Sequence, residues 1–126
     1  MDHMLYFDGN AKRISWAIKT SNETKEQFRE HAEIYLDQVT NLQSKYIALH
    51  VGIFWSIGVF IIKNGDVVRI MLDSDEMLEH LTSDRQSQDR LSELRKGFIN
   101  QLGDQRNIKF EYEKIESSDN IATKML

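Results

Sequence analysis

The longest hydrophobic segment of the chain, residues 46–72, is interrupted mainly by an Asn64-Gly65 pair. Asn-Gly between β-branched segments is typical of a two-residue hairpin loop, because both loop residues adopt positive φ. Since the flanking segments are apolar on both faces, we expect them in the middle of a sheet that is covered on each side. The pattern predicts strands over 46–55, 59–63 and 66–72.

The N-terminal residues 3–19 predict another hairpin. Apolar and polar or small residues alternate from residue 13 to 19, which is typical of a strand with one buried face. Asp8-Gly9 is the expected loop, and moving the loop to Gly9-Asn10 leaves the same residues on the buried face. That face consists of Leu5, Phe7, Ile14, Trp16 and Ile18.

Two longer segments have a helical period. Thr20 and Glu23 have capping-box spacing, and a stripe of apolar residues at intervals of three and four then predicts a helix over 23–43. A similar stripe, ending before Gly103, predicts a helix over 83–102. The remaining expected elements are a short helix over 73–81 and a strand over 108–113 that alternates apolar and charged residues.

The expected order of elements is therefore β-β-α-β-β-β-α-β. It predicts an α+β fold in a single domain, residues 1–126, with a mostly antiparallel central sheet and two long amphipathic helices. We expect residues 116–126 to form a loosely ordered tail. The β-β-α-β-β-β-α core resembles the element order of profilin-like and longin-like domains, a likeness of topology that transfers no functional residue.

Composition narrows the class of protein. The chain has 126 residues, a formal net charge of −4, and no cysteine, which excludes disulfides, thiolate metal sites and thiol catalysis. The apolar segment 46–62 contains His50 and two glycines and is short for a bilayer span, so we expect no membrane segment. We expect a small soluble protein located in the cytoplasm, for which nucleic acid is an unlikely partner because of the acidic charge.

Three carboxylates are candidates for a metal site. Asp8 ends the first predicted strand, Asp73 ends the strand after the Asn64 turn, and Glu30 lies on the predicted helix between them. Clustered oxygen ligands of this kind suit Mg²⁺ or Mn²⁺. The LYFDG segment around Asp8 resembles the opening strand of ribonuclease H-like nucleases. Each residue also has a purely structural interpretation: Asp8 as a turn residue, Asp73 as a helix cap, and Glu30 as solvated surface.

Two further groups of residues merit attention. His50 lies in an apolar segment, where a core or interface histidine with one hydrogen bond is more common than a catalytic one. If both helices cover one face of the sheet, the other face needs a partner, and a homodimer is the simplest solution. The candidate interface residues are Phe54, Trp55, Phe60 and Met71.

No catalytic motif is present, so whether the chain is an enzyme stays open. We expect a non-catalytic, homo-oligomeric interaction module that binds a protein or a small ligand and needs no cofactor. The alternative is a divalent-metal-dependent nuclease or phosphodiesterase that uses the clustered carboxylates. A third class, nucleic-acid binding through the basic residues of segment 85–96, is disfavoured because acidic residues interleave with them, as on a salt-bridged surface.

Overall fold

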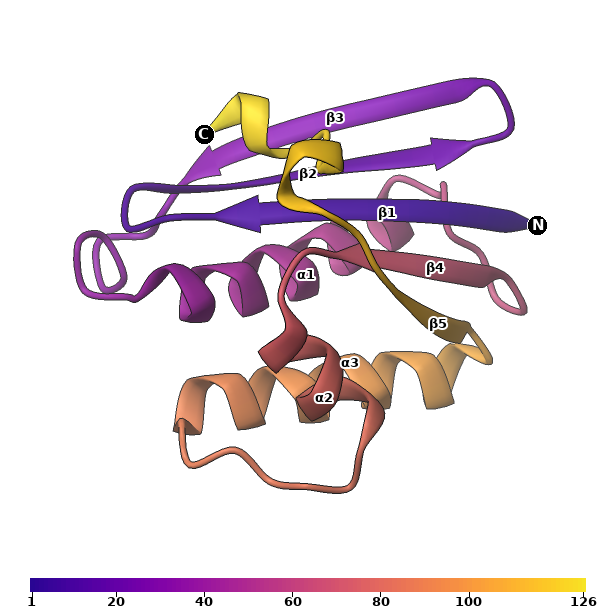
Figure 1. The fold of residues 1–126 in the computed structure, drawn as a ribbon. Helices are drawn as coiled ribbons and strands as arrows, with labels where there is room; N and C mark the ends of the chain where they lie inside the picture. The colour runs from indigo at the N-terminus through magenta and orange to yellow at the C-terminus, as the bar shows by residue number, and fades with distance from the viewer.

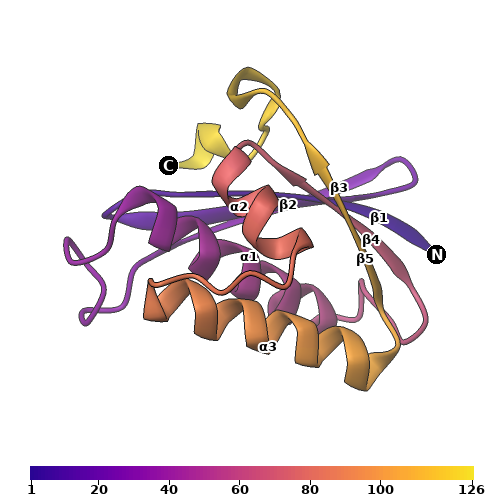
Figure 2. The same ribbon diagram turned by 60° about the horizontal axis from the view of Figure 1, so that its bottom comes forward.

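The computed structural model describes residues 1–126 and contains one five-stranded sheet with strand order β3-β2-β1-β4-β5. The helices lie on one side of this sheet, and the C-terminal segment crosses the other side (Figures 1 and 2). The strands are β1 (Asp2–Gly9), β2 (Arg13–Thr20), β3 (Glu23–Glu30), β4 (Val67–Leu72) and β5 (Lys109–Lys114). The helices are α1 (Asn41–Gly58), α2 (Asp75–Thr82), α3 (Arg90–Arg106), and the 3₁₀ turns η1 (Ser117–Asp119) and η2 (Thr123–Met125).

The α+β class is confirmed, and the sheet is mixed rather than mostly antiparallel. Strands β1, β2 and β3 form an antiparallel meander, whereas β1, β4 and β5 are parallel to one another. The parallel pairs arise because α1 connects β3 to β4 and α2 and α3 connect β4 to β5, which are crossover connections rather than hairpins. The carboxyl ends of β1 and β4 therefore lie next to each other, at the end of the sheet where both strands finish; we call this end the carboxyl edge.

The predicted N-terminal hairpin exists, with a different register. Leu5 pairs with Ile18 and Phe7 with Trp16, so the loop is longer than the expected two residues. The predicted apolar face is confirmed, because all five of its residues belong to the main hydrophobic core: Leu5, Phe7, Ile14, Trp16 and Ile18.

The predicted helix over 23–43 is wrong. Residues 23–30 form β3, which is exposed along its whole length and pairs only with β2 at the edge of the sheet. Its many charged side chains suit an exposed edge strand. Ser21 has a φ of 55° in the tight turn between β2 and β3, so the segment that resembled a helix cap is a hairpin loop.

The predicted strands over 46–55 and 59–63 are also wrong, because residues 41–58 form α1 and residues 59–63 lie in the turn that follows it. Thr40 caps this helix, and a reciprocal capping box joins it to Gln43. A continuous apolar run does not distinguish a buried strand from a buried helix by periodicity alone. Asn64-Gly65 therefore lies in the connection between α1 and β4, with Gly65 at a φ of 89°, and forms no hairpin.

The later elements follow the sequence more closely. The strand expected over 66–72 is β4, the short helix is α2, and the strand expected over 108–113 is β5. The second long helix begins at Arg90 rather than at residue 83, because Asp89 is its N-cap. No helix has both the length and the apolar content needed to span a bilayer.

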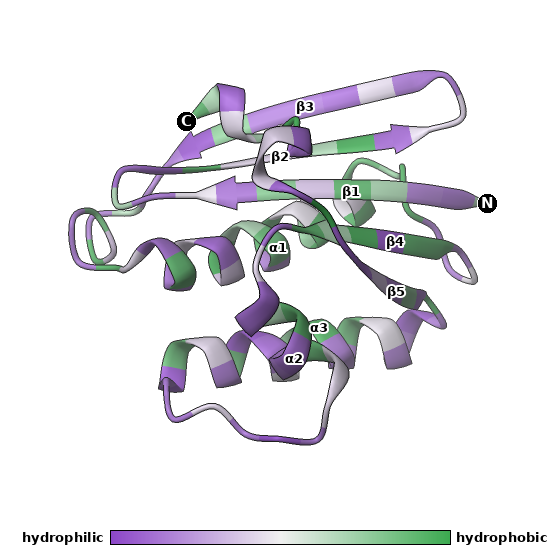
Figure 3. Cartoon of the chain, viewed as in Figure 1, coloured by the Kyte–Doolittle hydropathy of each residue, from purple (hydrophilic) through white to green (hydrophobic).

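The chain itself covers both faces of the sheet in its middle, at β1, β2 and β4, and leaves β3 exposed. The main core lies between the sheet and the helices, and β4 is a strongly hydrophobic strand whereas β3 is mostly hydrophilic (Figure 3). On the opposite face, Tyr6, Ala17 and Met71 pack with Ala122 of the C-terminal segment. Met71 is only 3% exposed, so it is not available as the interface residue that the sequence suggested.

Candidate functional site

Asp8 and Asp73 come together at the carboxyl edge of the parallel strands. The register pairs Tyr6 of β1 with Met71 of β4, and Asp8 and Asp73 lie two residues further along each strand. Their side chains are largely buried, with exposed fractions of 9% and 5%. We call this place the Asp8–Asp73 edge. The carboxyl ends of parallel strands are a common location for ligand sites in open sheets.

Lys45, from the beginning of α1, contacts both carboxylates. Its Nζ lies 2.9 Å from Oδ1 of Asp73 and 3.9 Å from Oδ1 of Asp8. The helix can approach β1 this closely because Gly9 has no side chain: a Cβ there would lie 2.2 Å from Oγ of Ser44. The amino end of α1 thus places a lysine, rather than another carboxylate, between the two strand ends.

The C-terminal segment completes the surroundings of the pair. Asn120 Nδ2 donates to Oδ2 of Asp73 at 3.0 Å and to the carbonyl oxygen of Phe7 at 2.9 Å. The hydroxyl of Thr123 donates to Oδ2 of Asp8. Burial by itself would raise the pKa of Asp73, but hydrogen bonds from Asn120 and Lys45 outweigh it, and this pKa lies below its usual value. Asp73 is therefore a carboxylate at neutral pH.

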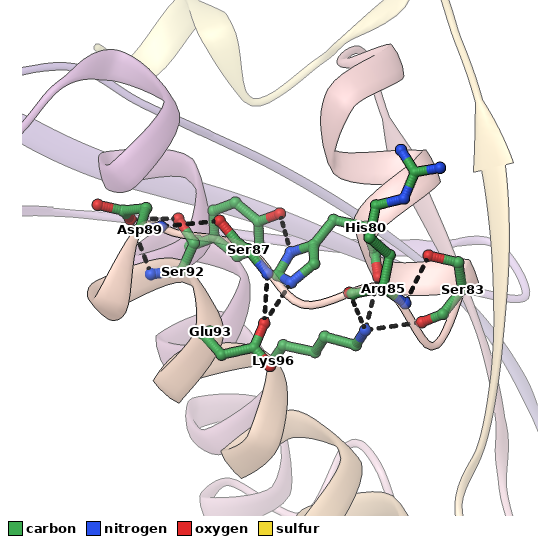
Figure 4. A network of polar contacts seen from close by, with 9 residues as sticks. His80, Ser83, Arg85, Ser87, Asp89, Ser92, Glu93 and Lys96 are labelled. Atoms are coloured by element: carbon green, nitrogen blue, oxygen red, sulfur yellow. Dashed lines mark hydrogen bonds and ion pairs between the residues drawn. The ribbon is translucent and has the colours of Figure 1, made fainter.

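A polar network fixes the first turns of α1 against the other helices (Figure 4). The Tyr46 hydroxyl lies 2.6 Å from Nδ1 of His80, and His80 Nε2 lies 2.7 Å from Oε1 of Glu93. One turn earlier, Gln43 Nε2 donates to Oδ1 of Asp89 at 2.8 Å. Because these residues lie on both sides of Lys45 in the sequence, the network fixes where the lysine projects.

Most of the basic residues of segment 85–96 already contact other groups of the protein. Lys96 Nζ donates to the backbone oxygens of His80 and Ser83, both at 2.7 Å, and so holds the α2–α3 connection (Figure 4). Arg85 pairs with Glu79 on the surface. The acidic residues interleaved in this segment are not the partners of these basic residues, because Asp89 caps α3 and Glu93 contacts His80, so the expected salt-bridged surface does not form.

Glu30 does not join the two aspartates. It is at the end of β3, two strands away from β1 in the sheet order, and its nearest cation is Arg13, with Nη2 4.0 Å from Oε1. Its side chain is exposed. No group of three or more carboxylate, histidine or cysteine side chains is placed to hold a metal ion.

His50 and the predicted interface residues lie elsewhere. His50 is on α1, where Nη1 of Arg95 donates to its Nδ1 at 2.9 Å and its ring stacks on Phe98. Burial and the neighbouring Arg95 lower the pKa of His50 to about 4, so it is neutral at physiological pH. Phe54 and Trp55 line a groove of about 490 Å³ next to His50, and Phe60 is exposed in the loop after α1.

Sequence reasoning missed Lys45, Asn120 and Thr123. Lys45 was assigned to the loop before a strand, and the other two were assigned to a tail. Thr40 and Gln43 have the same capping-box spacing as Thr20 and Glu23, and this was the one signal that could have moved the helix to its true start.

The fold is shared with ribonuclease H1 domains of known structure. RNase H1 from the halophilic archaeon Halobacterium salinarum NRC-1 is 15% identical, with 95% of this chain and 89% of that chain covered and a TM-score of 0.77. The N-terminal RNase H domain of rv2228c from Mycobacterium tuberculosis is 13% identical, with coverage of 98% and 95% and a TM-score of 0.78. LC11-RNase H1 in complex with an RNA/DNA hybrid is 17% identical, with coverage of 97% and 91% and a TM-score of 0.75.

No family model and no curated protein sequence matches the chain. At identities this low, the likeness establishes the ribonuclease H-like fold and not the activity. The fold is therefore ribonuclease H-like, and not profilin-like or longin-like as the expected order of elements suggested.

Two expectations from the sequence are corrected by these comparisons. The expectation of a non-catalytic, homo-oligomeric interaction module is contradicted, because several ribonuclease H1 domains share the fold over nearly their whole length. The expectation that nucleic acid is an unlikely partner is contradicted too, since one of these domains was solved with an RNA/DNA hybrid. The comparisons favour the alternative, a metal-dependent nuclease. The acidic net charge gave the wrong expectation about nucleic acid, because a net charge averages over the whole surface and does not describe the charges at one end of a sheet.

Proposed function

We propose that this chain acts on nucleic acid as a phosphodiesterase of the ribonuclease H-like class, with an RNA/DNA hybrid as the first substrate to test. The observation that carries the proposal is the position of Asp8 and Asp73, side by side at the carboxyl edge of β1 and β4. Support comes from the fold, which is shared with a domain solved in complex with an RNA/DNA hybrid. The cytoplasmic location expected from the sequence stays a prediction.

The two carboxylates fit a divalent cation whose remaining ligands are supplied by water and the substrate. Mg²⁺ is commonly bound by one or two carboxylates, with water and substrate phosphate as its other ligands. Asp8 and Asp73 supply such a pair, with no third carboxylate, histidine or cysteine placed beside them. When bound, Mg²⁺ or Mn²⁺ would polarise the phosphodiester and lower the pKa of the attacking water.

The neighbouring residues orient the pair and balance its charge. Asn120 holds Asp73, and the Thr123 hydroxyl and the Gly9 amide hold Asp8. Two buried carboxylates would repel a phosphate backbone, and the ammonium of Lys45 offsets part of that repulsion. Lys45 therefore favours the approach of an anionic substrate that the aspartates alone would repel.

Hydrolysis of a labelled RNA/DNA hybrid tests the proposal, with Mg²⁺ or Mn²⁺ present or removed by EDTA. We expect cation-dependent cleavage that falls roughly 100-fold or more in Asp8→Asn and in Asp73→Asn, since each removes one charged ligand. Glu30→Gln is the matched control, because Glu30 ends β3, two strands away from β1, without contacting the pair. Cleavage that persists in both aspartate variants, or that is absent from the native chain, contradicts the proposal.

A further inference from the structure

Every oxygen of the two aspartates already has a partner within the protein. Asp8 Oδ1 accepts from the Gly9 amide at 2.8 Å and its Oδ2 accepts from Thr123. Asp73 Oδ1 accepts from Lys45 and its Oδ2 accepts from Asn120. A carboxylate oxygen has more than one lone pair, so it can accept a hydrogen bond and still bind a metal ion, and the position of Lys45 is therefore the decisive observation. Here the side between the two groups is occupied by an ammonium.

The charges explain why Lys45 is there. Two buried carboxylates next to each other repel, and burial makes an uncompensated charge costly. Lys45 Nζ is within salt-bridge distance of both, and the lysine side chain is itself only 21% exposed. A divalent cation bound at the same place would lie within a few ångströms of this ammonium, with little solvent to screen the repulsion.

We propose that Lys45 is a built-in counter-cation that keeps the Asp8–Asp73 edge free of a resident divalent cation in the unliganded protein. A divalent cation then binds strongly only when another anion takes over the ammonium. This last step rests on the proposed function, in which the anion is a phosphate of the nucleic acid. Lysine is well suited to the exchange, because its flexible chain carries a point charge that pairs equally with carboxylate or phosphate.

A simpler view is that Lys45 only neutralises the pair and has no bearing on metal binding. The two views differ in what happens when the lysine is replaced. If the ammonium excludes the ion, then Lys45→Gln should create a cation site, and Lys45→Glu should create a stronger one with three carboxylates. If Lys45 is only structural, both variants should lose stability and gain no response to metal.

Thermal unfolding without nucleic acid decides between them. The wild type, Lys45→Gln, Lys45→Glu and the control Lys25→Glu are melted in EDTA and in millimolar Mn²⁺. Lys25 is on the exposed strand β3, opposite Ile18 of β2, so it carries the same change of charge far from the pair. We expect no Mn²⁺ response in the wild type or the control, a rise of several degrees in Lys45→Gln, and a larger rise in Lys45→Glu.

A double variant locates the ion. Adding Asp8→Asn to Lys45→Glu should abolish the Mn²⁺ response. The inference is overturned if the wild type responds as strongly as Lys45→Gln, or if neither Lys45 variant responds while both remain folded by circular dichroism. Should Lys45→Glu fail to fold in EDTA, Lys45→Gln alone carries the test, since glutamine adds no third negative charge to the pair.

These melts contain no substrate, so their outcome is independent of whether the chain cleaves a hybrid. Absence of cleavage together with the expected Mn²⁺ responses would refute the proposed function and keep the role of Lys45. Cleavage together with a wild-type Mn²⁺ response equal to that of Lys45→Gln would support the proposed function and refute the role of Lys45. Where cleavage occurs, the Mn²⁺ concentration for half-maximal rate should fall at least about tenfold in Lys45→Gln.

Discussion

Replacing Asp66 by Asn should lower the stability of the fold without affecting the candidate site. Asp66 precedes β4 at the end of the sheet opposite the Asp8–Asp73 edge. Its Oδ2 lies 2.8 Å from Nε2 of the buried His3 and accepts from the Lys63 amide at 2.8 Å, and its Oδ1 pairs with the N-terminal ammonium. Burial opposes ionisation, but these partners lower the pKa of Asp66 to about 2.

The size of the effect follows from the pKa shift. A carboxyl whose folded-state pKa is depressed stabilises the fold above its unfolded pKa, and this contribution is lost as pH falls through the folded value. A shift from 3.8 to about 2 corresponds to about 2 kcal/mol. The terminal ammonium is 65% exposed, so its share is screened, and we expect Asp66→Asn to cost about 1–2 kcal/mol at pH 7.

Urea unfolding followed by circular dichroism measures this difference. At pH 7 the midpoint should fall, and the melting temperature should drop by roughly 3–7 °C for a chain of this length. The difference between variant and wild type should shrink from pH 4 to pH 2, because wild-type Asp66 then becomes protonated. The exposed Asp2, on the same strand as His3, is the control, and Asp2→Asn should change little. Equal stability of Asp66→Asn and wild type at pH 7, or a difference that is the same at pH 2, would refute this reasoning.

Three further substitutions test local contacts of the α2–α3 connection, of β1 with α1, and of α3. Lys96→Met removes the hydrogen bonds of the ammonium to the backbone oxygens of His80, Ser83 and Arg85, so we expect a loss of roughly 2 kcal/mol and faster amide exchange over 83–89; unchanged exchange would contradict the role of Lys96. Gly9→Ala brings a Cβ to 2.2 Å from Ser44 Oγ and 2.8 Å from the Ser44 backbone carbon, so the melting temperature should fall by several degrees; an unchanged value would show that α1 can retreat freely. Gly97→Ala meets nothing within 4 Å in the middle of α3 and should raise stability by roughly 0.5–1 kcal/mol, measured by urea unfolding; a loss would contradict the open surroundings of Gly97.

The parts of the fold that could be predicted are those in which local pattern and tertiary environment agree. In β1 and β2, alternation placed Leu5, Phe7 and Trp16 on the buried face because one face meets α1 and the other meets a thin covering segment. The second long helix was found because Asp89 to Arg106 has polar residues toward solvent and apolar residues toward the core.

The parts that were missed are those in which tertiary position overrides the local pattern. Strand β3 has a single neighbour and no buried residue, so its sequence carries charges where a central strand carries valine or isoleucine. Helix α1 has buried residues over most of its circumference, so its sequence lacks the separate apolar and polar faces of a surface helix. Misplacing these two elements shifted Lys45 from a helix to a loop.

The sequence predicted only part of the candidate site, the two aspartates. Asp8 and Asp73 each follow an apolar strand, and that local signal survives the wrong topology. Their proximity depends on a parallel β1–β4 pairing, which the Asn64-Gly65 signal argued against. Lys45, Asn120 and Thr123 reach the pair from 28 to 115 residues away, a relation that residue spacing does not reveal.

The central claim is that nucleic acid binds at the Asp8–Asp73 edge. The most direct test is an NMR titration of the isotope-labelled chain with a short RNA/DNA hybrid in EDTA, following backbone amide shifts. The account predicts that the largest changes occur at Gly9, Lys45, Asp73 and Thr123, and that they weaken as salt is raised. Changes confined to the groove around Phe54, or no changes at all, would contradict it.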